Sequence, residues 1–187
     1  MKNISFIIFL TNLLFSQHHW ETAIFASDDW KFIIPDAEPS SNWNAIDFDD
    51  SSWSLSQGGF GYGDDDDGTI IDPSISVFLR KKFMISDLSK LSCAILNADF
   101  DDGYVAYLNG TEISRSYNLS EPGTFVPFDE TTYYDHEASL YSGGLPDYIF
   151  LDSLLINSLL TNGENVLSVQ VHNVGINSSD MSSNFFL

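Results

Sequence analysis

Acidic side chains gather in two short stretches of the sequence, where their spacing could serve metal binding or acid–base chemistry. Four of them are adjacent, and a hard divalent ion such as calcium would relieve their mutual repulsion. The spacing does not fit an EF-hand loop, because Gly68 at the sixth position would put Gly63 first and Ser74 twelfth. We predict either a structural calcium ion or a solvated turn at Asp64, Asp65, Asp66 and Asp67.

The second acidic stretch contains Asp99, Asp101 and Asp102, where one predicted strand ends and the next begins. Asp99 and Asp101 share a face at the two-residue period of a strand. Paired carboxylates carry out acid–base chemistry in glycosidases. Asp102 precedes Gly103, however, and aspartate before glycine is ordinary turn chemistry. We expect these acids to close a turn and predict no catalytic residue.

Aromatic residues make up 14% of the chain, and about half of the rings are expected to be structural. Flat sugar faces pack on aromatic rings, while polar side chains bind the hydroxyls, so loop tyrosines form a candidate glycan surface. The loop rings considered are Tyr117, Tyr133, Tyr134, Tyr141 and Tyr148. We predict ligand contacts at Tyr62, Asp101, Asp102, Tyr104, Tyr107, Arg115 and His172.

For two basic residues, a structural role is the alternative to ligand binding. His172 could hold the nearby loop through a hydrogen bond, and Arg80 could form a salt bridge with an Asp-rich loop. No histidine has a partner at zinc-site spacing, and the nucleophile-elbow, P-loop and dinucleotide-binding motifs are absent from the sequence.

The formal net charge is −20, from 27 acidic and 7 basic residues. This charge disfavours nucleic acid as a partner, because phosphate backbones are bound by basic surfaces. Neutral polysaccharide, divalent cations and basic partners remain compatible with the charge.

The N-terminal sequence MKNISFIIFLTNLLFSQ has one lysine before an apolar run that is too short to span a bilayer. We predict a signal peptide over residues 1–17 and a single exported domain over residues 18–187. No other stretch is apolar and long enough to cross a membrane. The lone Cys93 lies in an apolar run and is expected to be buried, which suits a bacterial secreted or cell-surface protein.

Short strands separated by turn residues dominate the chain, with one helix predicted over residues 152–160. Asn109-Gly110 is a strong hairpin signal, and residues 117–147 form a long excursion with little periodicity. The pattern predicts an all-β, antiparallel β-sandwich. Strands are expected at residues 20–25, 30–34, 75–85, 91–100, 103–109, 111–115 and 165–173.

Two further features concern the C-terminal part. Within residues 165–173, Leu167, Val169 and Val171 alternate with Ser168, Gln170 and His172, which predicts one buried face and one face in water. The sequence ends at SSNFFL, within an apparent final strand, so we expect a domain truncated at its C-terminal end and belonging to a longer protein.

An ordered set of motifs resembles a known module. FDDSSW, GFGYGDDDDGT, FLRKKF, ADFDDGYVAYLNGTEISR, GENVLSVQVHN and NSSDMS are similar to the galactose-binding-like jelly roll of secreted bacterial multidomain proteins with lamin-tail or CotH-type domains. A looser similarity exists to the sugar-binding domain of family-two glycoside hydrolases. The resemblance covers residues 20–187.

The resemblance implies a jelly-roll fold, a structural calcium ion in many members, and an accessory role beside C-terminal domains of the same chain. The leading hypothesis is a non-catalytic exported module that binds a polysaccharide or another glycan. The alternatives are a structural spacer or protein-docking domain without a small ligand and, third, a glycoside hydrolase.

Overall fold

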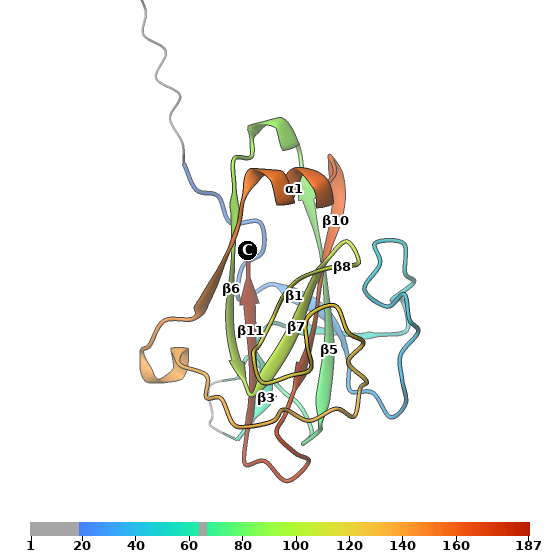
Figure 1. Ribbon diagram of the computed structural model, residues 1–187, viewed down its shortest axis with the longest axis vertical. Coiled ribbons are helices and arrows are strands. Elements are labelled where there is room, and N and C mark those ends of the chain that lie inside the picture. Colours follow the sequence, from blue (N-terminus) through green and yellow to red (C-terminus); the bar gives the residue numbers. More distant parts are fainter. Residues whose placement is uncertain (1–18, 64–66) are drawn as a thin grey trace, which may run out of the picture.

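Alternating apolar residues build two β-sheets whose inner faces pack together in a sandwich (Figure 1). The computed structural model describes residues 19–63 and 67–187. The predicted signal peptide lies outside the described residues. The all-β sandwich with one short helix is confirmed. In the described part of the chain, no helix is long and apolar enough to cross a membrane.

The first sheet, sheet A, has six strands that are all antiparallel to their neighbours. The Asn109-Gly110 turn joins two of them, and both turn residues have positive φ, as predicted. In spatial order the strands are β2 (Ser54–Gln57), β1 (Asp29–Ile33), β5 (Ser76–Ile85), β10 (Gly163–His172), β7 (Gly103–Leu108) and β8 (Thr111–Arg115).

The second sheet, sheet B, has five strands, with one short parallel pairing between β3 and β4. Its central strand, β11, is the last in the sequence and pairs with both β3 and β6. In spatial order the strands are β4 (Thr69–Ile70), β3 (Phe60–Tyr62), β11 (Met181–Phe186), β6 (Ala94–Asp101) and β9 (Asp147–Leu151).

The core between the sheets is aromatic and aliphatic, with buried side chains such as Phe60, Leu79, Phe100, Val169 and Phe185. Helix α1 (Ser153–Leu159) lies at one end of the sandwich and packs Ile156 into this core (Figure 1). The Asp152 side chain caps the helix by accepting a 2.9 Å hydrogen bond from the Leu155 amide. The predicted helix and its cap are confirmed.

The outer face of sheet A is covered by loops, although the alternation within residues 165–173 predicted a face in water. Loop 34–53 stacks Trp43 and Trp53 over Phe78 of β5. Arg80, buried on the same face, donates from Nε to Asp50 at 2.9 Å and from Nη1 to the Ala45 carbonyl at 3.1 Å. The salt-bridge interpretation of Arg80 is confirmed, and it attaches this loop to the sheet.

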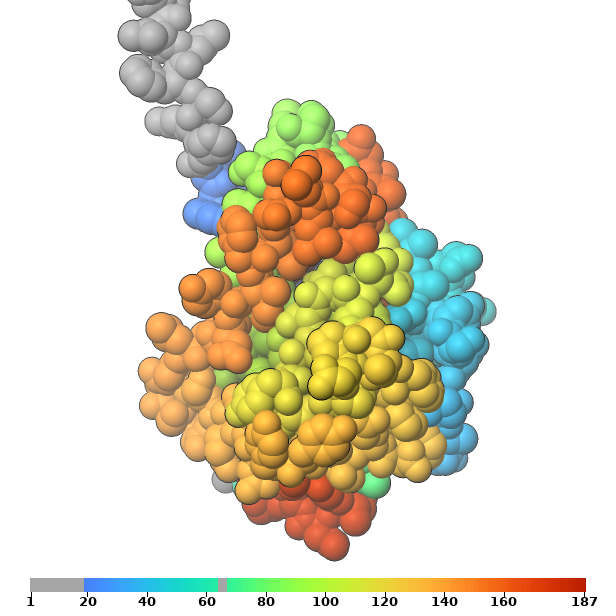
Figure 2. All heavy atoms as spheres, viewed as in Figure 1, coloured from blue at the N-terminus to red at the C-terminus, as the bar shows by residue number. Residues whose placement is uncertain are grey.

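A second segment, loop 116–146, covers the rest of that face and continues around the end of the sandwich (Figure 2). It packs Leu119 and Val126 against Val105 of β7. Consequently Ser168, Gln170 and His172 are buried beneath loops, and the prediction that they face water is wrong.

Residues 20–25 are not a strand, contrary to the prediction. The alternation there is too short, and the segment is held by the Ala23 and Ile24 amides, which both donate to the Leu187 carbonyl. The long excursion after β8 is confirmed, and it ends where β9 begins at the edge of sheet B.

Candidate functional site

Three carboxylates from distant parts of the chain meet at one end of sheet B. Asp101 ends β6, Glu137 belongs to loop 116–146, and Asp180 directly precedes β11. One oxygen from each lies within 4.8 Å of the others. Asp101 is buried, Asp180 is half-buried and Glu137 is exposed, so this acidic triad opens towards solvent on one side. The triad could hold a metal ion.

Strand alternation explains why Asp101 is buried away from the core. Ala98 and Phe100 of β6 face the core, so Asp99 and Asp101 lie on the outer face, which loop 116–146 covers. The Asp99 carboxylate accepts hydrogen bonds from the Ser139 amide at 2.8 Å and the Leu140 amide at 3.1 Å. Asp99 therefore fixes the loop to the sheet.

Asp102 has a similar structural role at the turn after β6. Its two carboxylate oxygens accept hydrogen bonds from the His136 amide at 2.8 Å and the Val174 amide at 2.6 Å. Asp101 differs from both neighbours, because no backbone amide among the described residues donates a hydrogen bond to its carboxylate, although only 4% of the residue is exposed. The buried Asp101 carboxylate thus lacks the compensation that Asp99 and Asp102 have.

The electrostatics of the triad reflect this lack of compensation. Burial, together with the charges of Asp102 and Asp180, raises the pKa of Asp101 to about 8. Burial also raises the pKa of Tyr62, whose hydroxyl accepts a 2.8 Å hydrogen bond from Asn173 Nδ2. The local field therefore favours either a proton or a cation between these carboxylates.

The predicted metal run can be placed only in part, since Asp64, Asp65 and Asp66 lie outside the described residues. The Asp67 carboxylate lies against Gly61 of β3, where an added Cβ would clash with it. Gly61 is paired with Ser182 of β11, and Ser182 is in turn paired with Asp101. Asp67 is therefore at the same end of sheet B as the triad.

Most of the predicted ligand contacts are buried. Tyr62, Asp101 and Asp102 lie together at the acidic end, whereas Tyr104 packs in the core between Phe100 and Phe185. The seven predicted ligand contacts therefore do not form a single accessible surface.

Two more predicted contacts lie under the loops of sheet A. Tyr107 is half-buried and packs edge-on against Trp43, with 5.6 Å between ring centroids. His172 is fully buried, with Nδ1 2.8 Å from the Glu130 carbonyl oxygen, and burial lowers its pKa to about 4. The alternative interpretation of His172, a histidine that holds a loop, agrees with this geometry, although the loop is 116–146.

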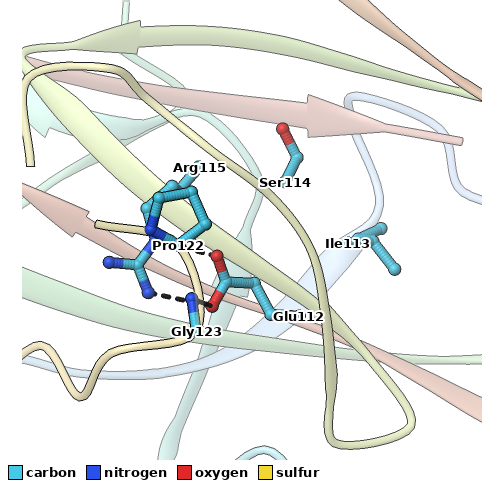
Figure 3. Close-up of a pocket in the computed structure, with 6 residues that line it drawn as sticks. All are labelled: Glu112, Ile113, Ser114, Arg115, Pro122 and Gly123. Carbon is cyan, nitrogen blue, oxygen red and sulfur yellow. Dashed lines mark hydrogen bonds and ion pairs between the residues drawn. The ribbon is translucent and has the colours of Figure 1, made fainter. Parts of the chain in front are cut away.

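Arg115, the remaining predicted contact, borders an open hollow of about 550 Å³ between β8 and loop 116–146 (Figure 3). Its guanidinium donates twice to the Glu112 carboxylate, each time at 2.8 Å, and also to the Ser120 and Thr124 carbonyls. The Gly123 amide donates to the same carboxylate at 3.1 Å (Figure 3). Arg115 thus holds a turn of the loop through bonds that a ligand would have to replace.

Exposed aromatic rings lie close to the acidic end. Tyr117 and Tyr134 are 70% and 49% exposed, and their ring centroids are 5.5 Å apart. The buried Asn118 fixes this tyrosine pair, because its Nδ2 donates to the Tyr134 carbonyl at 2.7 Å and to the Asp102 carbonyl at 3.2 Å. Both rings belonged to the loop tyrosines considered from sequence, but their pairing depends on chain folding that has no local sequence signal.

No protein-family model matches the chain, and no curated protein matches it significantly in sequence. Solved structures do resemble it. A beta-glycosidase from Bacteroides vulgatus superposes with a TM-score of 0.50 and 15% identity, covering 90% of this chain and 20% of the glycosidase. A glycosyl hydrolase family 2 member from Bacteroides cellulosilyticus gives a TM-score of 0.50 and 15% identity, over 89% of this chain and 20% of that one.

At this level of identity the likeness concerns the fold alone. The chain has the β-sandwich fold found in part of family-two glycoside hydrolase structures, and it spans about a fifth of each of these two enzymes. The looser of the two predicted resemblances is thereby confirmed for the fold. The association with lamin-tail or CotH-type domains stays a prediction.

Proposed function

We propose that this chain is a non-catalytic, exported accessory module of a larger protein and that it binds carbohydrate. The exposed tyrosine pair carries the proposal, because Tyr117 and Tyr134 are accessible while Asn118 holds their backbone in place. A fixed pair of rings loses little conformational entropy when a sugar packs on it. The exposed carboxylate of Asp135 follows directly in sequence and is available to accept hydrogen bonds from hydroxyls.

Burial of the acids supports a non-catalytic role over a glycosidase. A general acid must approach the glycosidic oxygen of a bound sugar within hydrogen-bonding distance. Asp101 and Asp102 are nearly inaccessible, and both oxygens of Asp102 are bonded to backbone amides. The charge of −20 favours neutral polysaccharides over anionic ones.

The test is binding of the folded chain to an array of neutral polysaccharides. We expect Tyr117→Ala and Tyr134→Ala each to weaken binding about tenfold or more, as expected for losing one stacked ring. Tyr148→Ala is the matched control, since Tyr148 is 73% exposed but lies on β9 at the edge of sheet B.

Either of two results would count against this function. Equal losses in the control and in the pair variants would show that the tyrosine pair is not the binding surface. Failure of the folded chain to bind any glycan would favour the alternative of a structural spacer or docking domain. In such a domain Asp99, Asp102 and Arg115 would serve only to anchor loops to the sheets.

A further inference from the structure

We propose that a basic pocket on sheet A binds a tetrahedral oxyanion, sulfate or phosphate, either as the free ion or as an ester on a small organic ligand. The pocket has a volume of about 210 Å³ and is formed by β1, β2, β5 and loop 34–53. The inference is independent of carbohydrate binding at the tyrosine pair. The residues that line the basic pocket are Asp29, Lys31, Asp50, Leu55, Arg80, Lys81 and Lys82.

Positive charge is concentrated at this pocket. Acidic residues outnumber basic ones by 27 to 7 in the whole chain, but four basic and two acidic residues line the pocket. The three basic residues elsewhere are Lys2, Lys90 and Arg115. The excess of charge among the lining residues is therefore positive, the reverse of the excess in the chain as a whole.

Strand pairing explains why the cations meet. Lys31 of β1 lies directly opposite Arg80 of β5, and directly opposed residues project from the same face of a sheet. Lys82 follows Arg80 by two positions along β5, so it projects from that face too. Like charges at directly opposed positions repel each other. An anion bound between these cations would replace repulsion by attraction.

Two of the cations have donors that the protein does not use. The fully buried Arg80 donates from Nε to Asp50, whereas its Nη2 has no hydrogen-bond partner in the described part of the chain. Lys31 Nζ donates to the Trp53 carbonyl at 2.9 Å and forms no ion pair with any described carboxylate. An ammonium group has three donors, so Lys31 retains two for a ligand.

Two nearby carboxylates hold the frame of the pocket. Asp50 accepts from Arg80 Nε at 2.9 Å, and this pair attaches loop 34–53 to β5. The Asp28 carboxylate lies 3.3 Å from Lys81 Nζ, which also donates to the Asp29 carbonyl at 3.0 Å. Arg80 and Lys81 are therefore positioned by the protein itself, before any ligand binds.

The remaining carboxylates compete with an anion only weakly or oppose it. Lys82 pairs with Glu164 at 2.9 Å, but both side chains are exposed, and an exposed pair contributes little to stability. Lys82 can thus exchange Glu164 for a ligand. The exposed Asp29 forms no ion pair among the described residues and borders the pocket, so its charge should weaken anion binding.

The donors and the size of the pocket select the class of anion. Lysine ammonium groups bind phosphate-like anions as point charges, whereas the forked donors that favour carboxylates belong to arginine, and Arg80 Nε is already bonded to Asp50. The volume is below the range of about 300–1,000 Å³ for small-molecule sites, so the pocket fits a charged group and not a whole ligand. The exposed Leu55, directly opposite Lys31, offers an apolar contact to the organic part of an ester.

The acidic surface as a whole still disfavours polyanions. Screening at physiological ionic strength limits the influence of the basic pocket to about 8 Å. A polymer with many charges would extend beyond this range onto a chain with a net charge of −20. The site therefore suits a single anionic group and remains compatible with a preference for neutral polysaccharides.

Isothermal titration calorimetry of the folded chain with sodium sulfate tests the proposal, with ionic strength held at about 0.15 M by sodium chloride. We expect saturable binding at one site. Lys31→Gln and Lys82→Gln should each weaken the affinity about tenfold or more, because each removes a charge-assisted hydrogen bond. Asp29→Asn should strengthen the affinity, because it removes an opposing charge, and damage to the fold cannot produce such a gain.

The matched control is Lys90→Gln, which removes the same charge from an exposed residue outside the pocket and should leave the affinity nearly unchanged. Thermal unfolding checks that each variant is folded. A parallel titration with glucose 6-sulfate distinguishes the two sources of the anion. Tighter binding of this ester than of free sulfate identifies an organic ligand, and tighter or equal binding of sulfate identifies the free ion.

Two results would overturn the proposal. The first is the absence of saturable binding of either probe to the unaltered chain. The second is a loss in Lys90→Gln as large as the losses in Lys31→Gln and Lys82→Gln, because the attraction would then follow net charge and not the pocket.

Discussion

At the scale of single residues, polar side chains in this protein mainly attach loops to sheets. Asp99, Asp102 and Arg80 each accept from or donate to the backbone of a loop. Such contacts explain why residues that looked like ligand contacts in the sequence are buried. Composition alone cannot distinguish a residue that anchors a loop from one that binds a ligand. An aspartate accepts a hydrogen bond in both cases, from a loop amide or from a ligand hydroxyl.

His172 provides a pH-dependent test at this scale. Its pKa falls from 6.5 to about 4 on burial, so the unfolded chain binds a proton more readily than the folded one. Stability should therefore decrease as the pH falls from about 6.5 towards 4, by up to about 2 kcal/mol between pH 7 and pH 5. Denaturant titrations at both pH values should show a smaller difference for His172→Gln than for the unaltered chain. An equal difference would contradict the burial of a neutral imidazole.

At the scale of elements, regular strands and turns were predictable because their signals are local. The β7–β8 hairpin, helix α1 and the long strand β10 follow from an Asn-Gly turn, a capping aspartate and apolar alternation. The burial of the outer face of β10 was not predictable. Polar residues such as Gln170 and His172 alternate with apolar ones in the same pattern whether loops or water cover them. The covering loops themselves have no periodicity, so nothing local indicates where they pack.

Asn109 contributes more than a turn conformation to the hairpin. Its Nδ2 donates to the Leu159 carbonyl and to Asn165, each at 2.8 Å, and its Oδ1 accepts from the Val166 amide at 2.8 Å. Asn109→Gly keeps the positive φ but loses these bonds, and it should lower the free energy of unfolding by about 1–3 kcal/mol. Asn109→Ala should lose more, because alanine also disfavours φ of 50°. Equilibrium denaturation measures both; equal stability of Asn109→Gly and the unaltered chain would exclude this bridging role.

At the scale of the whole molecule, the fold class could be predicted from sequence but the candidate sites could not. The acidic triad draws Asp101, Glu137 and Asp180 from segments far apart in the chain, and only the packing of loops over sheet B brings them together. The tyrosine pair has the same origin in loop packing. Sequence proximity instead drew attention to residues 64–67, of which Asp67 lies near the triad.

The net charge of −20 makes a prediction for the molecule as a whole. Self-repulsion destabilises a compact acidic protein, and salt screens it. Raising sodium chloride from about 0.01 M to 0.5 M should raise Tm by several degrees, since the Debye length falls from about 30 Å to about 4 Å. A neutral solute at equal osmolality is the control. A Tm that falls with salt would indicate that attractive ion pairs outweigh the repulsion.

The position of β11 in the middle of sheet B has a consequence during synthesis. β6 ends at residue 101 and β11 begins at residue 181, so 80 residues (181 minus 101) separate the two paired strands. At translation rates of about 5–20 residues per second, β6 waits roughly 4–16 seconds for β11, and β3, which ends at Tyr62, waits longer. During that time their unpaired edges could form hydrogen bonds with the strands of another chain. Repulsion between chains that each carry a charge of −20 opposes such pairing.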